Sequence, residues 1–486
     1  TGAPTGWTEV AREARLLTLS ASLGSDVNRL TELWLTICEA HRRYRDFTRH
    51  ELHEALQEVA AAFGVYRTYV RPGSGQVEPA DRAAVEAAVG KAEELRQDLD
   101  PDLFAFLRAI LLLEVNGPEA AELAARFQQL TPPAMAKGVE DTAFYRYLRL
   151  VALNEVGGDP GRFGVTPDEF HAVLVRDAAR WPRAMLATST HDTKRSEDVR
   201  ARLALLSEMP DAWREAVERL GRRAAPHRSG ADVPGPHAEY LFFQTLVGAW
   251  PIDADRAAAY MQKAAREAKE RTSWTSPDAD FEAALDSLVR GCLADPAFLA
   301  ELEAVVAPLV EPGRVNALAQ LLCKLAAPGV PDVYQGTELW DLSLVDPDNR
   351  RPVDFETRAS LVGGLGDAPP RLADDGRAKL WLLQRALQLR ARRPGDLGSQ
   401  GGYRPLAAHG PSASHVMAWL RGDGVVAVAQ RLPLGLAASG GWRGTVLPLP
   451  QGRWCNRLGR DAPHAGEAAL DELLAPFPVA LLELVG

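Results

Sequence analysis

Two long blocks of the chain carry apolar residues at helical spacing, and short apolar runs that end in polar clusters lie between them. Steps of three and four residues recur over residues 7–63 and again over 208–310. The short apolar run Ala184–Ala187 leads into the polar stretch "TSTHDTKRSED", and helical spacing resumes from Ser196. Strand, turn and helix therefore follow one another, which predicts an α/β fold in which helices dominate.

Two other parts of the chain show the alternation or residue types of strands. "VYRTYV", at 65–70, is β-branched and aromatic, which predicts a short strand. After the linker-like "RRPGDLGSQGG", the stretch "HVMAWLRGDGVVAVAQRL" holds two strand-like runs separated by Gly-Asp-Gly, a hairpin signal. The end, "FPVALLELVG", is also strand-like. Residues 395–486 are therefore expected to form a small all-β domain.

Length and composition limit the possible partners. The 486 residues exceed one ordinary core, so two or more domains are expected. A formal net charge of -10 argues against nucleic acid or an anionic membrane as a partner and is compatible with a neutral ligand such as a sugar. Four scattered cysteines predict neither a zinc site nor disulfides and fit a reducing cytoplasm. No apolar run is long enough to span a bilayer.

The polar stretch after Ala187 contains the first candidate site residues. His191, Asp192 and Lys194 follow a strand end, where catalytic side chains of α/β proteins usually lie. The alternative is structural, with Asp192 or Thr193 capping the next helix. For 196–198, "SED", helix capping and first-turn charge are the favoured interpretation.

Two further polar stretches offer candidates for a sugar site, because aromatic faces stack on pyranose rings and charges fix hydroxyls. In "AMAKGVEDTAFYRY" the candidates are Lys137, Glu140, Asp141, Tyr145 and Arg146, and in "DVYQGTEL" they are Tyr334, Gln335 and Glu338. The alternative for the first stretch is a buried ion-pair network, in which Arg146 bonds Glu140 or Asp141.

The remaining candidates are open to two interpretations. "DPDN", at 346–349, is typical of a turn, and a calcium site is the alternative although no EF-hand spacing is present. Trp250 and Trp274 fit either a sugar platform or the core. No metal and no cofactor is assigned.

Six stretches in this order carry a resemblance to a known family: "AMAKGVEDTAFYRY", "LNEVGGDP", "MLATSTHDTKRSEDVRARL", "EYLFFQTLVGAWP", "REAKERTSW" and "PGVPDVYQGTELWDLSLVDPDNRRPVDF". From about Val10 onward the chain resembles the maltooligosyltrehalose synthases of the α-amylase superfamily of glycoside hydrolases. The resemblance implies a (β/α)8 barrel and a maltooligosaccharide substrate. It also implies intramolecular transglycosylation, in which the reducing-end α-1,4 linkage becomes α,α-1,1 and leaves a trehalose unit.

One departure from the family matters for activity. Enzymes of this superfamily use an aspartate nucleophile in a G-x-R-x-D pattern, a glutamate acid/base and a second aspartate. The G-x-R-x-D pattern does not occur here, and the glutamate's strand has no counterpart. By resemblance, Asp192 is the remaining catalytic carboxylate. The chain, which begins at Thr1 rather than Met, is expected to be a C-terminal portion whose partner is the missing N-terminal half.

The resemblance also suggests a division of the chain. The expected parts are a helical insertion at 1–130, late barrel strands at 131–207, a second helical insertion at 208–315, the last barrel strand with helices at 316–394, and the all-β domain at 395–486. Because ends of barrel strands meet on one face, Asp192 and its neighbours are expected to share a cleft with Lys137 and the loop after Tyr334.

Two rival functions stay open at this point. The first is a non-catalytic carbohydrate-binding module, which the absent nucleophile favours and the intact "STHDTK" disfavours. The second is another α-amylase-type enzyme, such as a branching enzyme or a phosphorylase, and the helical insertions argue against it. The chain alone is expected to be inactive.

Overall fold

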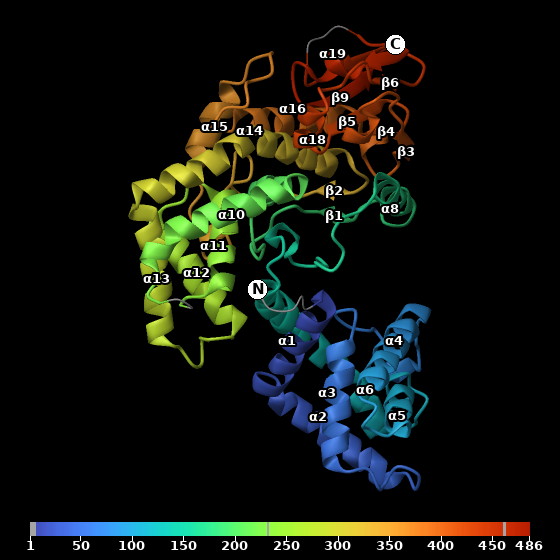
Figure 1. Cartoon of the computed structure of the whole chain (residues 1–486). Helices are drawn as coiled ribbons and strands as arrows, with labels where there is room; N and C mark the ends of the chain where they lie inside the picture. Colours follow the sequence, from blue (N-terminus) through green and yellow to red (C-terminus); the bar gives the residue numbers. More distant parts are fainter. Residues whose placement is uncertain (1–5, 231–232, 460–462) are drawn as a thin grey trace. The chain divides into compact units, whose positions relative to one another are not determined.

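The chain folds into two compact units. The computed structural model describes residues 6–230, 233–459 and 463–486. The first unit comprises Thr1–Leu148 and Ala264–Asp278, and the second comprises Arg149–Lys263 and Ala279–Gly486. Helices dominate, and antiparallel strands gather toward the C-terminus (Figure 1). The prediction of a helix-rich chain with a C-terminal sheet is confirmed. No helix in the described part of the chain is long and apolar enough to cross a membrane.

The first unit is built from helices around one apolar core that includes Trp34, Leu103 and Phe127. Helix α3 begins with a capping box, in which Glu51 N donates to Thr48 Oγ1 and Thr48 N donates to Glu51 Oε2. Proline opens three helices, where its fixed φ suits the first turn. The elements are α1 (Trp7–Ala21), α2 (Gly24–Ala40), α3 (Arg49–Ala62), η1 (Pro72–Ser74), α4 (Pro79–Leu95), α5 (Pro101–Leu111), α6 (Pro118–Met135), η2 (Ala136–Ala143) and α7 (Phe144–Arg146).

Two segments of the first unit differ from the sequence prediction. Residues 65–70 are not a strand, and the only pairing nearby is an isolated bridge between Arg71 and Gln76. The sequence predicts late barrel strands from residue 131 onward, but residues 136–143 form the π-helical segment η2 directly after α6. There Thr142 Oγ1 donates to the carbonyl of Lys137 at 2.8 Å, five residues earlier, which fits the wider π turn.

The second unit begins with helices that surround a short parallel strand pair. Strands β1 (Met185–Leu186) and β2 (Val330–Pro331) pair in parallel, with Met185 opposite Val330. A barrel of further strands is not seen among the described residues, which contain this one parallel pair. The other elements before the C-terminal sheet are η3 (Val151–Leu153), α8 (Pro167–Arg180), α9 (Glu197–Leu203), η4 (Ala204–Glu208), α10 (Pro210–Ala224), η5 (Ala225–His227), α11 (Pro236–Ala249), α12 (Ala254–Ala268), α13 (Ala279–Ala294), α14 (Pro296–Ala326), η6 (Asp348–Arg350), α15 (Phe355–Gly363), α16 (Arg377–Arg392) and α17 (Pro394–Leu397).

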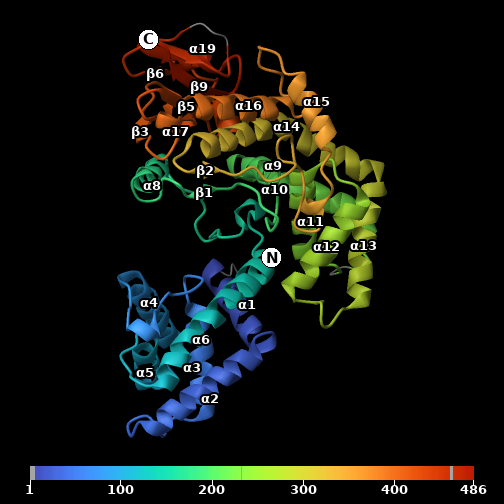
Figure 2. The same ribbon diagram turned by 180° about the vertical axis from the view of Figure 1, so that it is seen from behind.

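The C-terminal sheet has five antiparallel strands in the order β3-β4-β5-β9-β7. The predicted hairpin is confirmed, because β4 and β5 pair across Gly422–Gly424. One face packs on α14 and α16 (Figures 1 and 2), and Trp419 Nε1 donates to the carbonyl of Ala326 at 3.2 Å. The elements are β3 (Tyr403–Leu406), η7 (Ala413–His415), β4 (Val416–Arg421), β5 (Val425–Gln430), α18 (Pro433–Ala438), β6 (Val446–Pro448), β7 (Trp454–Asn456), β8 (Glu467–Ala469), α19 (Leu470–Leu474) and β9 (Val479–Leu484).

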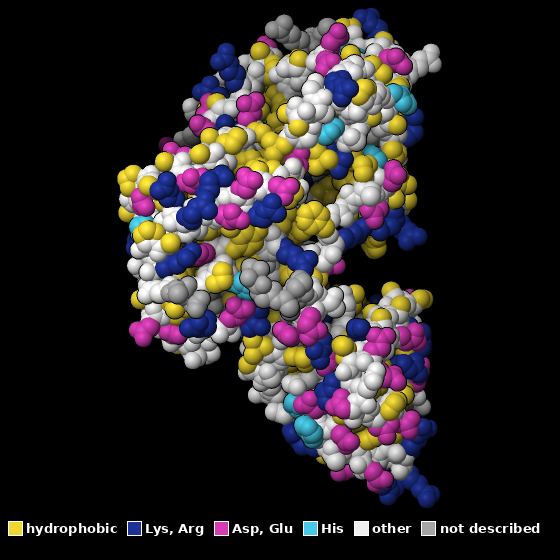
Figure 3. Space-filling view, in the orientation of Figure 1, with side chains coloured by type: hydrophobic (Ala, Val, Ile, Leu, Met, Phe, Trp, Pro, Cys, Tyr) yellow, Lys and Arg dark blue, Asp and Glu magenta, His cyan; other side chains and the backbone are white. Residues whose placement is uncertain are grey.

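The surface of each unit carries charges of both signs. Figure 3 shows basic and acidic side chains interspersed on the visible face, without a large region of one sign.

Candidate active site

The polar stretch after β1 forms a tight turn that its own threonines hold. Thr190 N donates to Thr193 Oγ1 at 2.6 Å, and Asp192 N donates to Thr190 Oγ1 at 3.2 Å. The side chain of Asp192 is half-buried and that of His191 is exposed. Among the described residues, none makes a hydrogen bond to the Asp192 carboxylate or to the His191 ring. The turn therefore presents a carboxylate and an imidazole whose bonding capacity is available to a ligand.

A second segment, distant in sequence, fixes the position of this turn. Asn349 Nδ2 donates to the carbonyls of Thr190 at 3.3 Å and His191 at 3.2 Å, and Arg350 Nε donates to the His191 carbonyl at 3.2 Å. Tyr334 OH donates to the carbonyl of Asn349 at 3.1 Å. The structure thus brings the loop after β2 together with the turn after β1.

Glu155 holds the other side of the turn. Its carboxylate accepts hydrogen bonds from Lys194 N at 2.8 Å and from Arg195 N at 3.2 Å. Arg195 is itself buried and donates to Tyr260 OH at 2.7 Å. Lys194 is buried, with only 3 % of its surface exposed, so it is not a freely extended surface lysine. Glu155, from the "LNEVGGDP" stretch, had not been singled out from the sequence.

The loop after β2 contains the three remaining candidates of the second unit. Thr337 Oγ1 donates to the Tyr334 carbonyl at 2.7 Å and tightens the loop. Glu338 accepts from Arg358 Nε at 2.9 Å and from Gly336 N at 3.0 Å, so its carboxylate shapes the loop itself. Gln335 is exposed.

The five candidates from "AMAKGVEDTAFYRY" lie in the first unit, on η2 and α7. Lys137 Nζ pairs with Asp141 Oδ2 at 2.6 Å, and Glu140 accepts a hydrogen bond from Tyr66 OH. Tyr145 is buried. Arg146 does not bond Glu140 or Asp141 in the contacts described for it; it donates to the carbonyls of Ala268 at 2.6 Å and Lys269 at 3.3 Å.

The "DPDN" stretch acts as a structural turn. Asp346 pairs with Lys263 at 2.8 Å, and Asp348 pairs with Arg256 at 2.8 Å while it accepts from Leu344 N at 2.7 Å. Among the described residues, no group of three His, Cys, Asp or Glu side chains is placed to hold a metal ion.

The two tryptophans considered for a sugar platform lie in different units. Trp274 is 55 % exposed in the first unit, with the Arg266 guanidinium 4.8 Å from its ring centre. Trp250 belongs to the second unit and lines a cavity there.

A buried charge cluster follows the candidate turn at the start of α9. Lys379 Nζ lies 2.8 Å from Glu197 Oε1 and 2.8 Å from Asp198 Oδ2, and Lys324 Nζ lies 3.4 Å from Glu197 Oε2. All four side chains are buried. Of the interpretation favoured for 196–198, the first-turn charge is present, because Glu197 and Asp198 lie in the first turn of α9. The side-chain cap is not formed: Ser196 Oγ donates to the carbonyl of Asp341 and makes no cap hydrogen bond.

The cluster separates the acidities of its two carboxyl groups. Burial by itself would raise the pKa of Glu197, but Lys379 and Lys324 outweigh it and lower that pKa to about 2. Burial dominates at Asp198, where Lys379 only partly offsets it, and raises the pKa of that carboxyl to about 6. The sequence signal for this cluster is a lysine inside each of two apolar helical runs, "LLCKLAAPG" and "RAKLWLL".

Comparison with known proteins points to one class, proteins named as maltooligosyltrehalose or glycosyltrehalose synthases. A putative maltooligosyl trehalose synthase of Mycobacterium tuberculosis is 41% identical in an alignment of 463 residues that covers 89% of this chain and 56% of that protein. The solved maltooligosyltrehalose synthase of Arthrobacter ramosus is 40% identical with a TM-score of 0.87, over 100% of this chain and 59% of that one. A solved glycosyltrehalose synthase, DSM5389, is 27% identical with a TM-score of 0.77, over 100% of this chain and 56% of that one.

These similarities confirm the resemblance inferred from the six sequence stretches. The chain is similar to maltooligosyltrehalose synthases along its length, and it spans somewhat more than half the length of the relatives it matches. No family model matches the chain.

Proposed function

We propose that this chain supplies part of the active site of a maltooligosyltrehalose synthase, which converts the reducing-end α-1,4 linkage of a maltooligosaccharide into an α,α-1,1 linkage. The observation that carries the proposal is the Asp192 carboxylate, which the turn after β1 holds beside His191 without a described hydrogen-bond partner. The similarity to named synthases supports the choice of reaction.

The proposed role of Asp192 follows from the chemistry of glycosyl transfer. Transfer with retention passes through an oxocarbenium-like transition state flanked by two carboxyl groups about 5 Å apart. A third carboxylate accepts hydrogen bonds from sugar hydroxyls, and these strengthen as the ring flattens. Such bonds lower the barrier by several kcal/mol. In this proposal Asp192 is that third carboxylate and His191 bonds the same sugar ring.

We further propose that β1 and β2 are late strands of a (β/α)8 barrel, and that the rest of the barrel comes from the part of the synthase outside this chain. Met185 and Val330 are opposite each other in the pair and are 66 % and 44 % exposed. Apolar side chains on short open strands are a surface that further strands can cover. This missing part would also bring the nucleophile and the acid/base.

The chain alone is therefore proposed to lack turnover. The covalent step and the proton transfer both need groups from the missing part, and general acid/base help alone accounts for about a hundred- to ten-thousand-fold in rate. Asp192 only stabilises the transition state of a reaction that the nucleophile and the acid/base carry out.

The test is reconstitution. The chain is incubated with maltopentaose alone, and then together with the segment of the Arthrobacter ramosus enzyme that lies outside its aligned 59%. Loss of reducing ends is followed over time. We expect no turnover from the chain alone and restored turnover from the mixture. In the mixture, Asp192→Asn should lower kcat at least a hundredfold, whereas Asp423→Asn, on an exposed hairpin turn, should leave kcat unchanged.

Two outcomes would contradict the proposal. Turnover of the order of ten per second by the chain alone would mean that the catalytic carboxylates are misassigned, and Glu140 and Asp141 would then be mutated first. Binding of maltopentaose without turnover in any reconstituted mixture would favour a carbohydrate-binding module.

A surface variant tests the proposed barrel closure separately from the chemistry. Met185→Asp should leave the melting temperature of the chain nearly unchanged, because the side chain is 66 % exposed, yet it should block reconstitution. Val362→Asp on α15, at a residue 40 % exposed, is the matched control and should reconstitute normally.

A further inference from the structure

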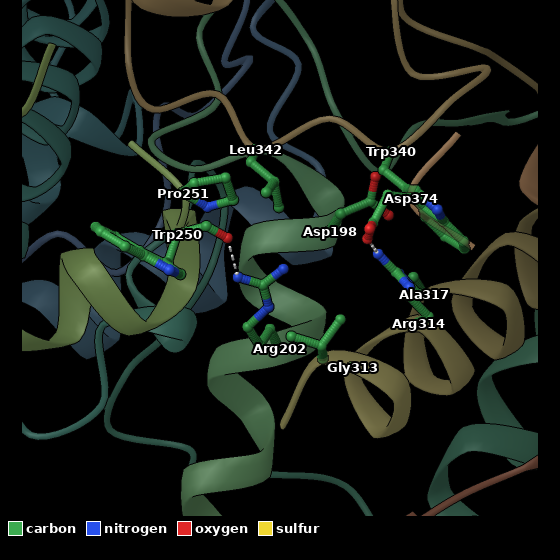
Figure 4. Close-up of a pocket in the computed structure, with 11 residues that line it drawn as sticks. Asp198, Arg202, Trp250, Pro251, Gly313, Arg314, Ala317, Trp340, Leu342 and Asp374 are labelled. Atoms are coloured by element: carbon green, nitrogen blue, oxygen red, sulfur yellow. Dashed lines mark hydrogen bonds and ion pairs between the residues drawn. The ribbon is translucent and has the colours of Figure 1, made fainter. Parts of the chain in front are cut away.

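The second unit contains a cavity that none of the candidate residues of the turn at 190–193 lines. It lies between α9 and α14, beside the chain at Trp250 and at Trp340 (Figure 4). Its volume is about 420 Å³. Ligand pockets in proteins commonly have volumes of about 300–1,000 Å³. The cavity is therefore large enough for a small organic molecule.

Arg202 is a buried cation in this cavity without a carboxylate partner. Only 7 % of its surface is exposed, and its Nη1 donates to the carbonyls of Trp250 at 2.6 Å and Val247 at 3.3 Å. No described residue accepts from its Nε or Nη2, and no described carboxylate forms an ion pair with it. Burial, and then the neighbouring Arg314, lower its pKa to about 10. An unpaired buried charge is costly unless something neutralises it.

Asp198 contributes an unused acceptor to the same cavity. Its Oδ2 accepts from Lys379 Nζ at 2.8 Å and from Asp341 N at 2.7 Å, but its buried Oδ1 has no hydrogen-bond partner among the described residues. A hydroxyl group that enters the cavity could donate to this oxygen. An unsatisfied buried oxygen of this kind marks a place where a ligand group gains a full hydrogen bond.

The other charges that line the cavity are already balanced. Arg314 pairs with Asp374 and lies 5.7 Å from the centre of the Trp340 ring, while Lys379 compensates Asp198. The charge left over is that of Arg202. The walls between these groups are apolar, with Trp250, Leu342 and Ala317 among them. A ligand that fits therefore carries one anionic group, at least one hydroxyl and a compact carbon skeleton.

We propose that this cavity binds a small hydroxylated anion of the size of a sugar phosphate or a sugar acid, with its anionic group paired to Arg202 and a hydroxyl donating to Asp198 Oδ1. This site is independent of the function proposed for Asp192. Phosphate and carboxylate share the chemistry that Arg202 recognises, because both accept paired hydrogen bonds from a guanidinium.

The test is calorimetric titration of the chain with four probes: glucose 6-phosphate, glucuronate, glucose and inorganic phosphate. We expect at least one of the two anionic sugars to bind at least tenfold more tightly than glucose and than inorganic phosphate, and the stronger of the two identifies the anionic group. The proposal is overturned if none of the four probes binds saturably, or if glucose binds as tightly as the anionic sugars.

Variants locate the binding. Val310→Phe fills the cavity from α14 and should weaken the binding at least tenfold, whereas Val362→Phe on α15 should bind like the wild type. Arg202→Gln keeps an amide donor on a shorter side chain but removes the charge, and it should weaken the binding of the anionic sugars without affecting that of glucose. If Arg202→Gln does not fold by circular dichroism, Val310→Phe still decides, because unchanged binding in that variant places the ligand elsewhere and overturns the proposal.

Discussion

At the scale of single residues, the geometry of the candidate turn depends most on Asn349. Its one amide nitrogen lies within hydrogen-bond reach of the carbonyls of Thr190, His191 and Thr193. We expect Asn349→Ala to lower the free energy of unfolding by about 1–3 kcal/mol, because the three carbonyls lose the amide that joins them, although the His191 carbonyl keeps Arg350 Nε as a donor. In the reconstituted enzyme it should also lower kcat at least tenfold, because a misplaced carboxylate no longer meets the sugar.

The matched control for Asn349 is Asn316→Ala, which removes a single 3.2 Å hydrogen bond to the Ala201 carbonyl. Chemical denaturation and the maltopentaose assay give both quantities. A full kcat in Asn349→Ala with the expected loss of stability would show that the turn keeps its shape without this anchor.

Also at this scale, the two buried carboxyl groups predict how stability depends on pH. The pKa of Glu197 falls from 4.5 to about 2 on folding, so its contribution is present above pH 4.5 and is lost as the pH falls toward 2. The pKa of Asp198 rises from 3.8 to about 6, so the folded state holds that proton more tightly and the free energy of unfolding falls as the pH rises from about 4 to about 6.

The variant Asp198→Asn isolates the second effect. The free energy of unfolding of Asp198→Asn, minus that of the wild type, should increase as the pH rises from 4 to 6. Asp423→Asn should follow the wild-type profile. Urea unfolding at half-unit pH steps measures both. A difference between Asp198→Asn and wild type that stays constant over this range, or moves the other way, would contradict the assignment.

Local pattern could predict where His191 and Asp192 lie, because a short apolar run, a polar stretch and a helix are adjacent in sequence. It could not predict the burial of Glu197 and Asp198. Their partners Lys324 and Lys379 lie 127 and 181 residues away, and only the fold brings them to the start of α9. A polar residue followed by two acidic residues at a helix start is expected both for helix capping and for a buried ion-pair cluster, so the sequence alone does not distinguish the two.

At the scale of elements, Lys379 joins α16 to α9. It is fully buried and pairs with both Glu197 and Asp198. We expect Lys379→Met to lower the free energy of unfolding by about 3–5 kcal/mol, because it leaves two buried carboxylates without their shared cation. Arg377→Met, on the same helix, breaks an exposed 3.2 Å pair with Asp375 and should cost less than about 1 kcal/mol. Equal effects of the two variants in urea unfolding would rule out a structural role for the cluster.

Elements that a short sequence motif specifies could be predicted, whereas elements that depend on contacts with distant parts of the chain could not. The hairpin of β4 and β5 is specified by Gly-Asp-Gly, because Gly422 adopts a φ of 53° and an added Cβ would lie 2.1 Å from Asp396 Oδ1. By contrast, "VYRTYV" has the residue types of a strand, but none of the described strands pairs with it. The π-helical turn at 136–143 follows Pro132 and Pro133 inside α6, where a sequence pattern predicts a helix end.

At the scale of the whole molecule, the first unit has a core of its own. Every buried residue of its main apolar cluster lies between Leu19 and Ala134, so the second segment of this unit, Ala264–Asp278, adds nothing to that cluster. We expect residues 1–148, expressed alone, to give a helical circular dichroism spectrum and one cooperative thermal transition.

The comparison for this fragment is the same chain with Leu103→Ala, at a fully buried position. That variant should lower the free energy of unfolding by about 2–5 kcal/mol. A fragment that is helical but melts without cooperativity would show that Ala264–Asp278 is needed to order the core.

The discontinuity of the first unit has a consequence for its synthesis. The carbonyl that accepts from Arg146 Nε belongs to Ala268, 122 residues further along the chain. At translation rates of about 5–20 residues per second, the ribosome needs on the order of ten seconds to make that stretch. The helical bundle therefore assembles first on the nascent chain. The hydrogen bonds from Arg146 to the Ala268 carbonyl and from the Lys269 ammonium to Thr142 form only after residues 268 and 269 have been synthesised.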